Sequence, residues 1–202
     1  MTSRARDARR CGQRIPGRTK AYEPRQLLRC SSTEKNLPHQ VAQIQTLQLA
    51  KALLFMHERE IAHLDVKPDN IYVKNGVYKL GDFGCATQLN SSLPVEEGDA
   101  RYMPQEILND NFDHLDKVDI FSMGASMYEL IRGSPLPESG PQFLNLREGK
   151  LPLLPGHSLH FQNLLNVPRL RFFQWDLCRF VFCFWGKSSI LWLSDVLDFF
   201  RS

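Results

Sequence analysis

The sequence is poor in cysteine, and its five cysteines are scattered without a Cys-x-x-Cys pair. An odd, scattered set fits a reducing compartment and argues against a disulfide framework or a zinc cluster. Long apolar runs are also lacking, since the most apolar stretch, Phe180 to Trp185, is far shorter than the roughly 20 residues that span a bilayer. The first 30 residues are polar and rich in arginine, without the apolar segment of a secretory signal. We therefore expect a soluble intracellular chain with no membrane partner.

Excess charge is lacking too, because the net charge of +3 over 202 residues is too small to indicate nucleic-acid binding. The charge is nevertheless uneven along the chain. Residues 1–40 carry ten Lys and Arg against three Asp and Glu, residues 41–165 carry ten against sixteen, and residues 166–202 carry five against three. We take these three stretches as the domain organisation of the chain.

The basic N-terminal stretch, residues 1–40, has no helical or strand periodicity and few large apolar residues. This composition predicts a disordered or poorly packed segment. Its arginines are compatible with a nuclear-import patch, an organelle transit peptide or a solvated tail. Of these three interpretations we favour the solvated tail.

Regular patterns begin at Val41. Apolar residues recur at spacings of three and four, which predicts a helix that ends near His57 and buries Val41, Ile44, Leu47, Ala50 and Leu54. Two short apolar runs, at 71–73 and 77–80, are joined through Asn-Gly, the strongest short signal of a β-hairpin. Residues 118–131 read as a buried helix, and the proline-rich residues 134–158 read as loop with short turns. The predicted fold class is α+β, mainly α, with a small β-hairpin.

Two polar loops flank the predicted hairpin. The first carries Asp65, Lys67 and Asn70, and the second carries Asp82. Phosphoryl transfer needs a carboxylate for the acceptor hydroxyl, a cation facing the γ-phosphate, and at least two oxygen ligands for Mg²⁺. Because the hairpin would bring the two loops side by side, the sequence predicts a phosphoryl-transfer site there.

These loops also match a family pattern. His63 to Asn70 resembles the protein-kinase catalytic loop H-R-D-x-x-x-x-N, and Asp82-Phe83-Gly84 resembles the magnesium-binding D-F-G. Residues 98–106 resemble the end of an activation segment, and Asp119 to Gly124 resembles the helix whose Asp braces the catalytic-loop backbone. Each pattern alone would more often be a turn, a core histidine or a helix cap. Because all four occur in order, residues 41–165 are identified as a partial protein-kinase domain.

Departures from the general kinase pattern narrow the resemblance. Leu64 replaces the Arg that would pair with a phosphorylated activation segment, and Asp99 replaces the Thr of Ser/Thr kinases. Lys67 nevertheless keeps the Ser/Thr form of the loop. This mixture closely resembles the Wee-type mitosis-inhibitory kinases, plant members especially. The resemblance implies phosphorylation of a tyrosine in a cyclin-dependent kinase, a delay of mitotic entry, and residence in the nucleus.

The resemblance also implies a role for each residue of the two loops. Asp65 would be the catalytic base, and Lys67 would contact the γ-phosphate. Asn70 and Asp82 would be the magnesium ligands. The implied cofactors are therefore ATP and Mg²⁺, and the implied protein partner is a cyclin-dependent kinase.

Several parts of a kinase are not recognisable upstream of Val41. A glycine-rich loop over the phosphates, a strand Lys on the α/β-phosphates and its Glu partner are all missing. Each charge-assisted hydrogen bond lost is worth roughly 1.5–3 kcal/mol, so ATP binding would weaken by about a hundredfold to ten-thousandfold. We expect a C-terminal-lobe fragment, without the small lobe, that has little or no activity. Two alternatives are a non-catalytic interaction fragment that competes for the same partners, and a chain that forms no stable protein.

The C-terminal stretch, residues 166–202, holds seven of the thirteen Phe and all three Trp in no clean period. Such a stretch is compatible with a buried aromatic helix. We favour sequence from outside the kinase frame, such as a retained intron. An aromatic tail on an unfinished domain would promote aggregation.

Overall fold

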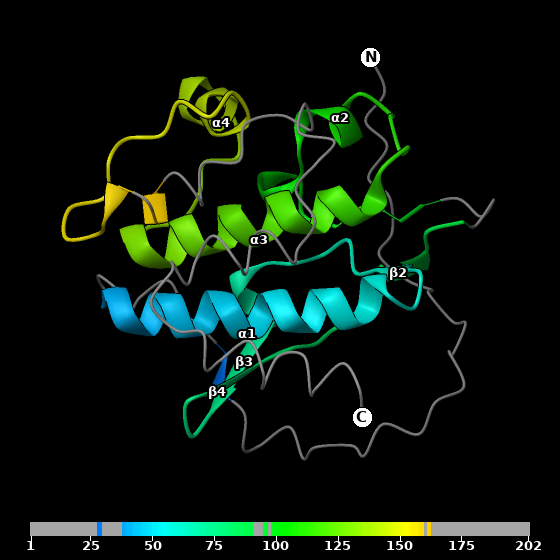
Figure 1. The fold of residues 1–202 in the computed structure, drawn as a ribbon. Helices are drawn as coiled ribbons and strands as arrows, with labels where there is room; N and C mark the ends of the chain where they lie inside the picture. Colours follow the sequence, from blue (N-terminus) through cyan, green and yellow to red (C-terminus); the bar gives the residue numbers. More distant parts are fainter. Residues whose placement is uncertain (1–27, 30–37, 91–94, 97, 160, 163–202) are drawn as a thin grey trace.

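Two long helices form the centre of the molecule. The computed structural model describes residues 28–29, 38–90, 95–96, 98–159 and 161–162. In it, α1 (His39–His57) and α3 (Leu115–Arg132) pack side by side and run in opposite directions (Figure 1). The sequence predicts both helices, and the structure confirms them with ends that differ by a few residues.

The buried face of α1 differs from the predicted one. Ala50 is buried as predicted, but Ile44 is 47% exposed. The residues of α1 that are buried are Ala42, Gln45, Thr46, Leu49, Ala50 and Leu53. Apolar periodicity misses Thr46 because its hydroxyl is satisfied inside the helix, where it donates to the carbonyl of Ala42 at 2.7 Å. The predicted face is therefore wrong for Ile44, whereas Val41 and Leu54 are partly buried against the core, and the helix itself is correct.

The predicted β-hairpin is confirmed. β3 (Ile71–Lys74) and β4 (Val77–Leu80) pair antiparallel, with Ile71 opposite Leu80. Asn75 and Gly76 at the turn have φ values of 52° and 74°, the left-handed backbone that a tight two-residue turn requires. Antiparallel pairing brings the start of β3 and the end of β4 to the same end of the hairpin, so the loops before β3 and after β4 lie together.

A short third strand joins this sheet. β1 (Leu28–Arg29) pairs antiparallel with β3, so that the strand order is β1-β3-β4. The prediction that residues 1–40 lack regular structure is wrong for these two residues, because a two-residue strand is too short to leave a periodic pattern. It is also wrong for His39 and Gln40, which form the start of α1. Residues 1–27 and 30–37 of that stretch lie outside the described residues, as do residues 163–202, which include the whole aromatic-rich stretch 166–202.

Short elements hold the loops between the long helices. They are β2 (Ile61–Ala62), η2 (Pro68–Asn70), β5 (Thr87–Gln88), η3 (Ala100–Tyr102) and α2 (Gln105–Leu108). β2 pairs antiparallel with β5 and thereby closes the polar loops into one compact region. Among the described helices, none has the length and apolar character needed to cross a membrane.

One helix lies where the sequence predicts only loop and turns. α4 (Pro141–Arg147) forms within the proline-rich stretch 134–158. Proline is compatible with the first turn of a helix, because the amide hydrogen that it lacks would have no partner there. Counting prolines therefore underestimates helix in this region, and the loop prediction is wrong for these seven residues.

The described apolar core has two parts. The larger part lies between α1, α3 and the hairpin and includes Leu49, Leu53, Met123 and Met127, all fully buried. Burying one such side chain is worth about 1.5–3 kcal/mol. The smaller part, Ala62, Leu64, Met103, Ile107, Leu115 and Val118, lies beneath the polar loop that follows β2. The candidate site therefore rests on a packed apolar base.

Candidate active site

The polar loop after β2 is anchored to α3 by Asp119. This side chain is fully buried, and its two carboxylate oxygens accept hydrogen bonds from the backbone amides of His63 and Leu64, both at 2.8 Å. The same carboxylate lies 2.8 Å from Nε2 of His57 at the end of α1. One carboxylate of α3 therefore fixes the end of α1 and the start of the loop together, as the resemblance to the bracing Asp of kinases implies.

Leu64 has a left-handed backbone, with a φ of 59°. A residue other than glycine in this region costs of order 1–3 kcal/mol and persists only where the surroundings enforce it. Here the amide of Leu64 is held by Asp119, and its side chain is buried in the smaller apolar cluster. This left-handed backbone turns the chain so that the next residue, Asp65, lies in the candidate site.

Three of the four predicted site residues meet at the carboxylate of Asp65. Its Oδ2 lies 2.8 Å from Nζ of Lys67 and accepts a hydrogen bond from Nδ2 of Asn70, also at 2.8 Å. The same Nδ2 donates to the backbone carbonyl of Asp65 at 2.8 Å. Both donor contacts require nitrogen at that position, so the amide oxygen of Asn70 is turned away from Asp65.

Lys67 is kept charged by its neighbours. Its partial burial would lower its pKa, but the hydrogen bond and the charge of Asp65, together with the charges of Asp99 and Asp69, raise the pKa above the ordinary value. The ammonium group therefore stays positive at neutral pH. It can face an anionic phosphate while it also orients Asp65.

The fourth predicted residue, Asp82, lies two residues after the end of β4 and is exposed. Its backbone φ is 61°, a second left-handed residue beside the loop. The hairpin joins it to the first loop, because the amide of Gly81 donates to the backbone carbonyl of Asn70 at 3.0 Å. Asn70 makes this hydrogen bond itself, and Asp82 follows its other partner, Gly81. The two predicted metal ligands therefore start from neighbouring points of the backbone.

His63 supports both loops from below. The ring is fully buried; Nδ1 accepts a hydrogen bond from the amide of Asp65 at 3.2 Å, and Nε2 lies 3.1 Å from the carbonyl of Gly81. Since Nδ1 accepts, Nε2 carries the proton and donates. Burial lowers the pKa of His63, although the charge of Asp119 acts against this. His63 is therefore a neutral structural residue.

The activation-segment motif packs directly on Asp65. The amide of Asp99 donates to Oδ1 of Asp65 at 3.2 Å, and Gly98 is in close contact with the same side chain. Asp99 also pairs with Arg101, whose Nη2 lies 2.6 Å from Oδ2. Burial would raise the pKa of Asp99, but the hydrogen bonds and charge of Arg101 lower it, so the carboxylate stays ionised.

A buried glutamate on α3 holds the other end of this segment. Glu129 accepts hydrogen bonds from the hydroxyl of Tyr102 and from the amide of Leu136, both at 2.8 Å. Burial, followed by the charge of Glu129, raises the pKa of Tyr102 far above its usual range. Ser122 adds a hydrogen bond to the carbonyl of Tyr102 at 2.8 Å. Glu129 is not among the predicted site residues, because the residues around a single glutamate in an apolar helix do not indicate which groups it will contact.

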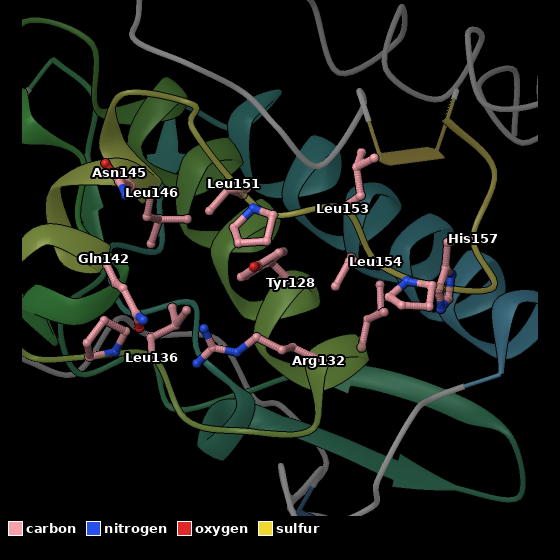
Figure 2. A pocket seen from close by; sticks show the side chains of 14 residues that line it. Tyr128, Arg132, Leu136, Gln142, Asn145, Leu146, Leu151, Leu153, Leu154 and His157 are labelled. Atoms are coloured by element: carbon pink, nitrogen blue, oxygen red, sulfur yellow. The ribbon is translucent and has the colours of Figure 1, made fainter.

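A pocket of about 450 Å³ lies away from these loops. Figure 2 shows Tyr128 and Arg132 from α3, Leu146 from α4, and Leu154 around it. None of the residues that line it is one of the four predicted site residues. The chemistry of the candidate site therefore belongs to the loops around Asp65 and not to this pocket.

The chain is similar to known protein kinases. The chain matches the family described as "Protein kinase domain" over residues 19–153. It is 76% identical to the "Wee1-like protein kinase" of Arabidopsis thaliana over 120 residues, which cover 59% of this chain and 24% of that protein. It is 57% identical to the "Wee1-like protein kinase" of Oryza sativa subsp. japonica over 166 residues, covering 77% and 32%. Identity to the protein of the same name in Drosophila melanogaster is 33% over 153 residues, covering 59% and 25%.

The chain matches only part of each of these relatives. It spans about a quarter to a third of the length of the curated relatives that it matches. The family match begins at residue 19, inside the stretch 1–40, while the domain limits at 40 and 165 stay a prediction. The described residues, mainly helical with a small antiparallel sheet, are consistent with part of a kinase fold. The chain belongs to the protein kinase family, and within it to the Wee-type kinases.

Proposed function

We propose that this chain transfers the γ-phosphate of Mg-ATP to a protein hydroxyl, specifically a tyrosine of a cyclin-dependent kinase, and so delays mitotic entry. One observation carries the proposal: Lys67 and Asn70 both contact Oδ2 of Asp65 at 2.8 Å, beside the loop of Asp82. The tyrosine target and the role in mitosis rest on likeness to the Wee1-like kinases. Residence in the nucleus is part of the same proposal.

Asp65 is suited to the acceptor side of this reaction. Its Oδ1 is held by the amide of Asp99, and its Oδ2 by Lys67 and Asn70, so the carboxylate has one fixed orientation. A fixed carboxylate can accept a hydrogen bond from an incoming hydroxyl and take its proton as transfer proceeds. Lys67, which stays positive, can balance the charge of the phosphoryl group on the same side.

The oxygen donors at the two loops fit a magnesium ion. Asn70 turns its amide oxygen away from Asp65, and Asp82 is an exposed carboxylate in the loop after β4. Both are hard oxygen ligands of the kind that Mg²⁺ takes at phosphate sites. When bound, the ion would neutralise charge on the phosphates. Asn70 would then serve both the ion and Asp65, which couples metal binding to the orientation of the catalytic carboxylate.

Turnover by this chain should be slow. Its 202 residues contain no recognisable glycine-rich loop or strand lysine for the ATP phosphates. We expect phosphate transfer that depends on the loop residues but is well below the typical kinase rate of about 1–100 per second.

The test is phosphate transfer to a purified cyclin-dependent kinase, with the modified residue identified by mass spectrometry. The unsubstituted chain should label a tyrosine, and Asp65→Asn, which keeps the shape of the side chain, should abolish this labelling. Labelling of serine or threonine only would overturn the tyrosine target. Equal labelling by Asp65→Asn would overturn the role of Asp65.

A non-catalytic interaction fragment is the second candidate. It is favoured by the described segment 98–108, which packs against α3 through the hydrogen bonds of Tyr102 with Glu129 and Ser122. Such a fragment would bind a cyclin-dependent kinase and compete with the full-length kinase. Pull-down by a folded Asp65→Asn chain that transfers no phosphate would support it, and absence of binding would reject it.

A further inference from the structure

Arg147 of α4 is a buried cation without a buried anion beside it. It is 3% exposed, and none of the carboxylates in the described part of the chain forms an ion pair with it. Burial lowers the pKa of Arg147 to about 10. Burying an uncompensated charge is costly. Apolar packing alone would favour an uncharged side chain here, so the guanidinium needs another explanation.

The guanidinium group bridges α4 and η3. Nη1 donates to the carbonyl of Phe143 in its own helix at 2.8 Å, and Nη2 donates across to the carbonyl of Ala100 at 2.5 Å. Nη2 also lies 3.5 Å from the carbonyl of Arg101. The guanidinium carbon lies 3.4 Å from the centroid of the Phe143 ring, which shields the charge. One side chain thereby ties the backbone of residues 100 and 101 to α4.

This tie is one of three contacts that join the backbone of residues 99–102 to side chains outside the segment, and the hydroxyl of Tyr102 adds a side-chain contact to Glu129. The amide of Asp99 binds Asp65, the carbonyl of Ala100 binds Arg147, and the carbonyl of Tyr102 binds Ser122 of α3. The first contact is made to the predicted catalytic carboxylate itself. A shift of the carbonyl at residue 100 would therefore move the amide that orients Asp65.

We propose that Arg147 is a positioning residue that fixes the backbone of 99–102 on Asp65 and so shapes the surface that receives the protein acceptor. This inference rests on the proposed kinase function. It adds a residue from α4 to a site whose sequence motifs lie between residues 63 and 124. Nucleotide binding, which depends on other elements, should not depend on Arg147.

The geometry favours arginine over lysine at this position. A planar guanidinium can donate in two directions and lie flat on Phe143, whereas an ammonium is a compact point charge. Arg147→Lys can still reach one carbonyl at neutral pH. A buried lysine loses its proton more readily than a buried arginine, so its hold on Ala100 should weaken as the pH rises.

The test compares Arg147→Met, Arg147→Lys and the unsubstituted chain at full length. Arg132→Met is the matched control, because Arg132 also donates to two backbone carbonyls, those of Ser134 and Pro135, but at the other end of α3. The first readout is the rate of trypsin cleavage after Arg101 at pH 7 and pH 9, normalised to an unstructured peptide. The second is the KM for the protein acceptor against the KM for ATP.

We expect Arg147→Met to speed cleavage after Arg101 by about tenfold to a hundredfold at both pH values, the fold-change expected for loss of a charged hydrogen bond. Arg147→Lys should protect the bond after Arg101 from cleavage at pH 7 but not at pH 9. Packing alone would not produce this pH dependence. In Arg147→Met, the KM for the protein acceptor should rise at least about fivefold, whereas the KM for ATP should stay within about twofold of that of the unsubstituted chain. The control should match the unsubstituted chain.

Two results would overturn the inference. One is a folded Arg147→Met chain with unchanged cleavage after Arg101, and the other is faster cleavage with an unchanged KM for acceptor. If the unsubstituted chain transfers no phosphate, the proposed function fails separately, and the pH-dependent cleavage rates alone decide whether Arg147 positions the segment.

Discussion

Gly98 lies against Asp65 so closely that a Cβ at Gly98 would be 2.5 Å from Oδ1 of Asp65 and 2.5 Å from the carbonyl oxygen of Leu64. The glycine is required here by lack of space. The contact allows the next amide, that of Asp99, to reach the same oxygen of Asp65. Residues 98–99 and the loop of Asp65 are thus packed as one unit.

The first prediction concerns this contact. Gly98→Ala should push the segment off Asp65, because one obstacle is a backbone carbonyl that cannot rotate away. We expect phosphate transfer to fall by about a hundredfold or more, the scale seen when reacting groups are displaced by about 1 Å. Initial rates of transfer from Mg-ATP measure this. Ala100→Ser, at an exposed position of the same segment, should stay near the unsubstituted rate, and an equal loss in both variants would contradict the steric argument.

The second prediction concerns Asp119. Asp119→Asn replaces one acceptor oxygen by an NH₂ group that would face the amide of His63 or Leu64. We expect the free energy of unfolding to fall by about 2–4 kcal/mol, since a buried charged hydrogen bond is lost and an amide is left unsatisfied. Urea titration measures the change.

Asp116→Asn on the same helix is the matched control. Asp116 pairs with Lys117 at a partly exposed site, 2.9 Å apart. Its loss should cost less than about 1 kcal/mol. Equal destabilisation by the two substitutions would mean that Asp119 does not brace the loop.

Much of the site could be predicted from the sequence, because its residues are neighbours along the chain. Asp65, Lys67 and Asn70 lie within six positions, and local backbone geometry alone brings them together. The Asn75-Gly76 turn signal correctly joined this loop to Asp82. Motif spacing is informative wherever a turn or a short loop fixes the distance.

The rest of the site depends on partners distant in sequence. Arg147 contacts a carbonyl 47 positions away, and Glu129 contacts a hydroxyl 27 positions away. No periodicity encodes such pairings, because they depend on how α3 and α4 pack. Thr46 on the buried face of α1 was not predicted for a related reason: its polar hydroxyl is satisfied within the helix. Apolar patterning assumes that polar residues face water.

The third prediction concerns pH. Burial holds the pKa of His63 below 6.5 in the folded chain, whereas in the unfolded chain it should be about 6.5. As the pH falls through 6.5, the unfolded state binds a proton that the folded state does not, so the free energy of unfolding should decrease. The slope contributed by His63 is at most about 1.4 kcal/mol per pH unit.

Ring-proton NMR titration of His63 measures this directly. The His63 signal should titrate below pH 6.5, and His63→Gln should flatten the pH dependence of stability. Burial also lowers the pKa of His157, with the charge of His39 acting in the same direction, so the comparison is best made in a His157→Asn background. A His63 signal that titrates at or above 6.5 would contradict the buried neutral ring.

The fourth prediction concerns the metal. Asn70→Ala removes one oxygen donor and the hydrogen bond that orients Asp65. The Mg²⁺ concentration for half-maximal transfer should rise by about tenfold to a hundredfold, as for loss of a supporting metal-site residue. Asn109→Ala, which removes only an exposed bond to Gln105 at 3.1 Å, should leave the requirement unchanged. An unchanged requirement in Asn70→Ala would remove Asn70 from the metal site.

The central claim is that the loops around Asp65 form a working phosphoryl-transfer site within this chain. The most direct measurement is transfer of labelled γ-phosphate from Mg-ATP to protein under single-turnover conditions, by a sample shown to be folded by cooperative unfolding. The account predicts slow transfer by the unsubstituted chain and none by Asp65→Asn. A folded chain that transfers no phosphate, or an Asp65→Asn chain that transfers it equally well, would contradict the claim.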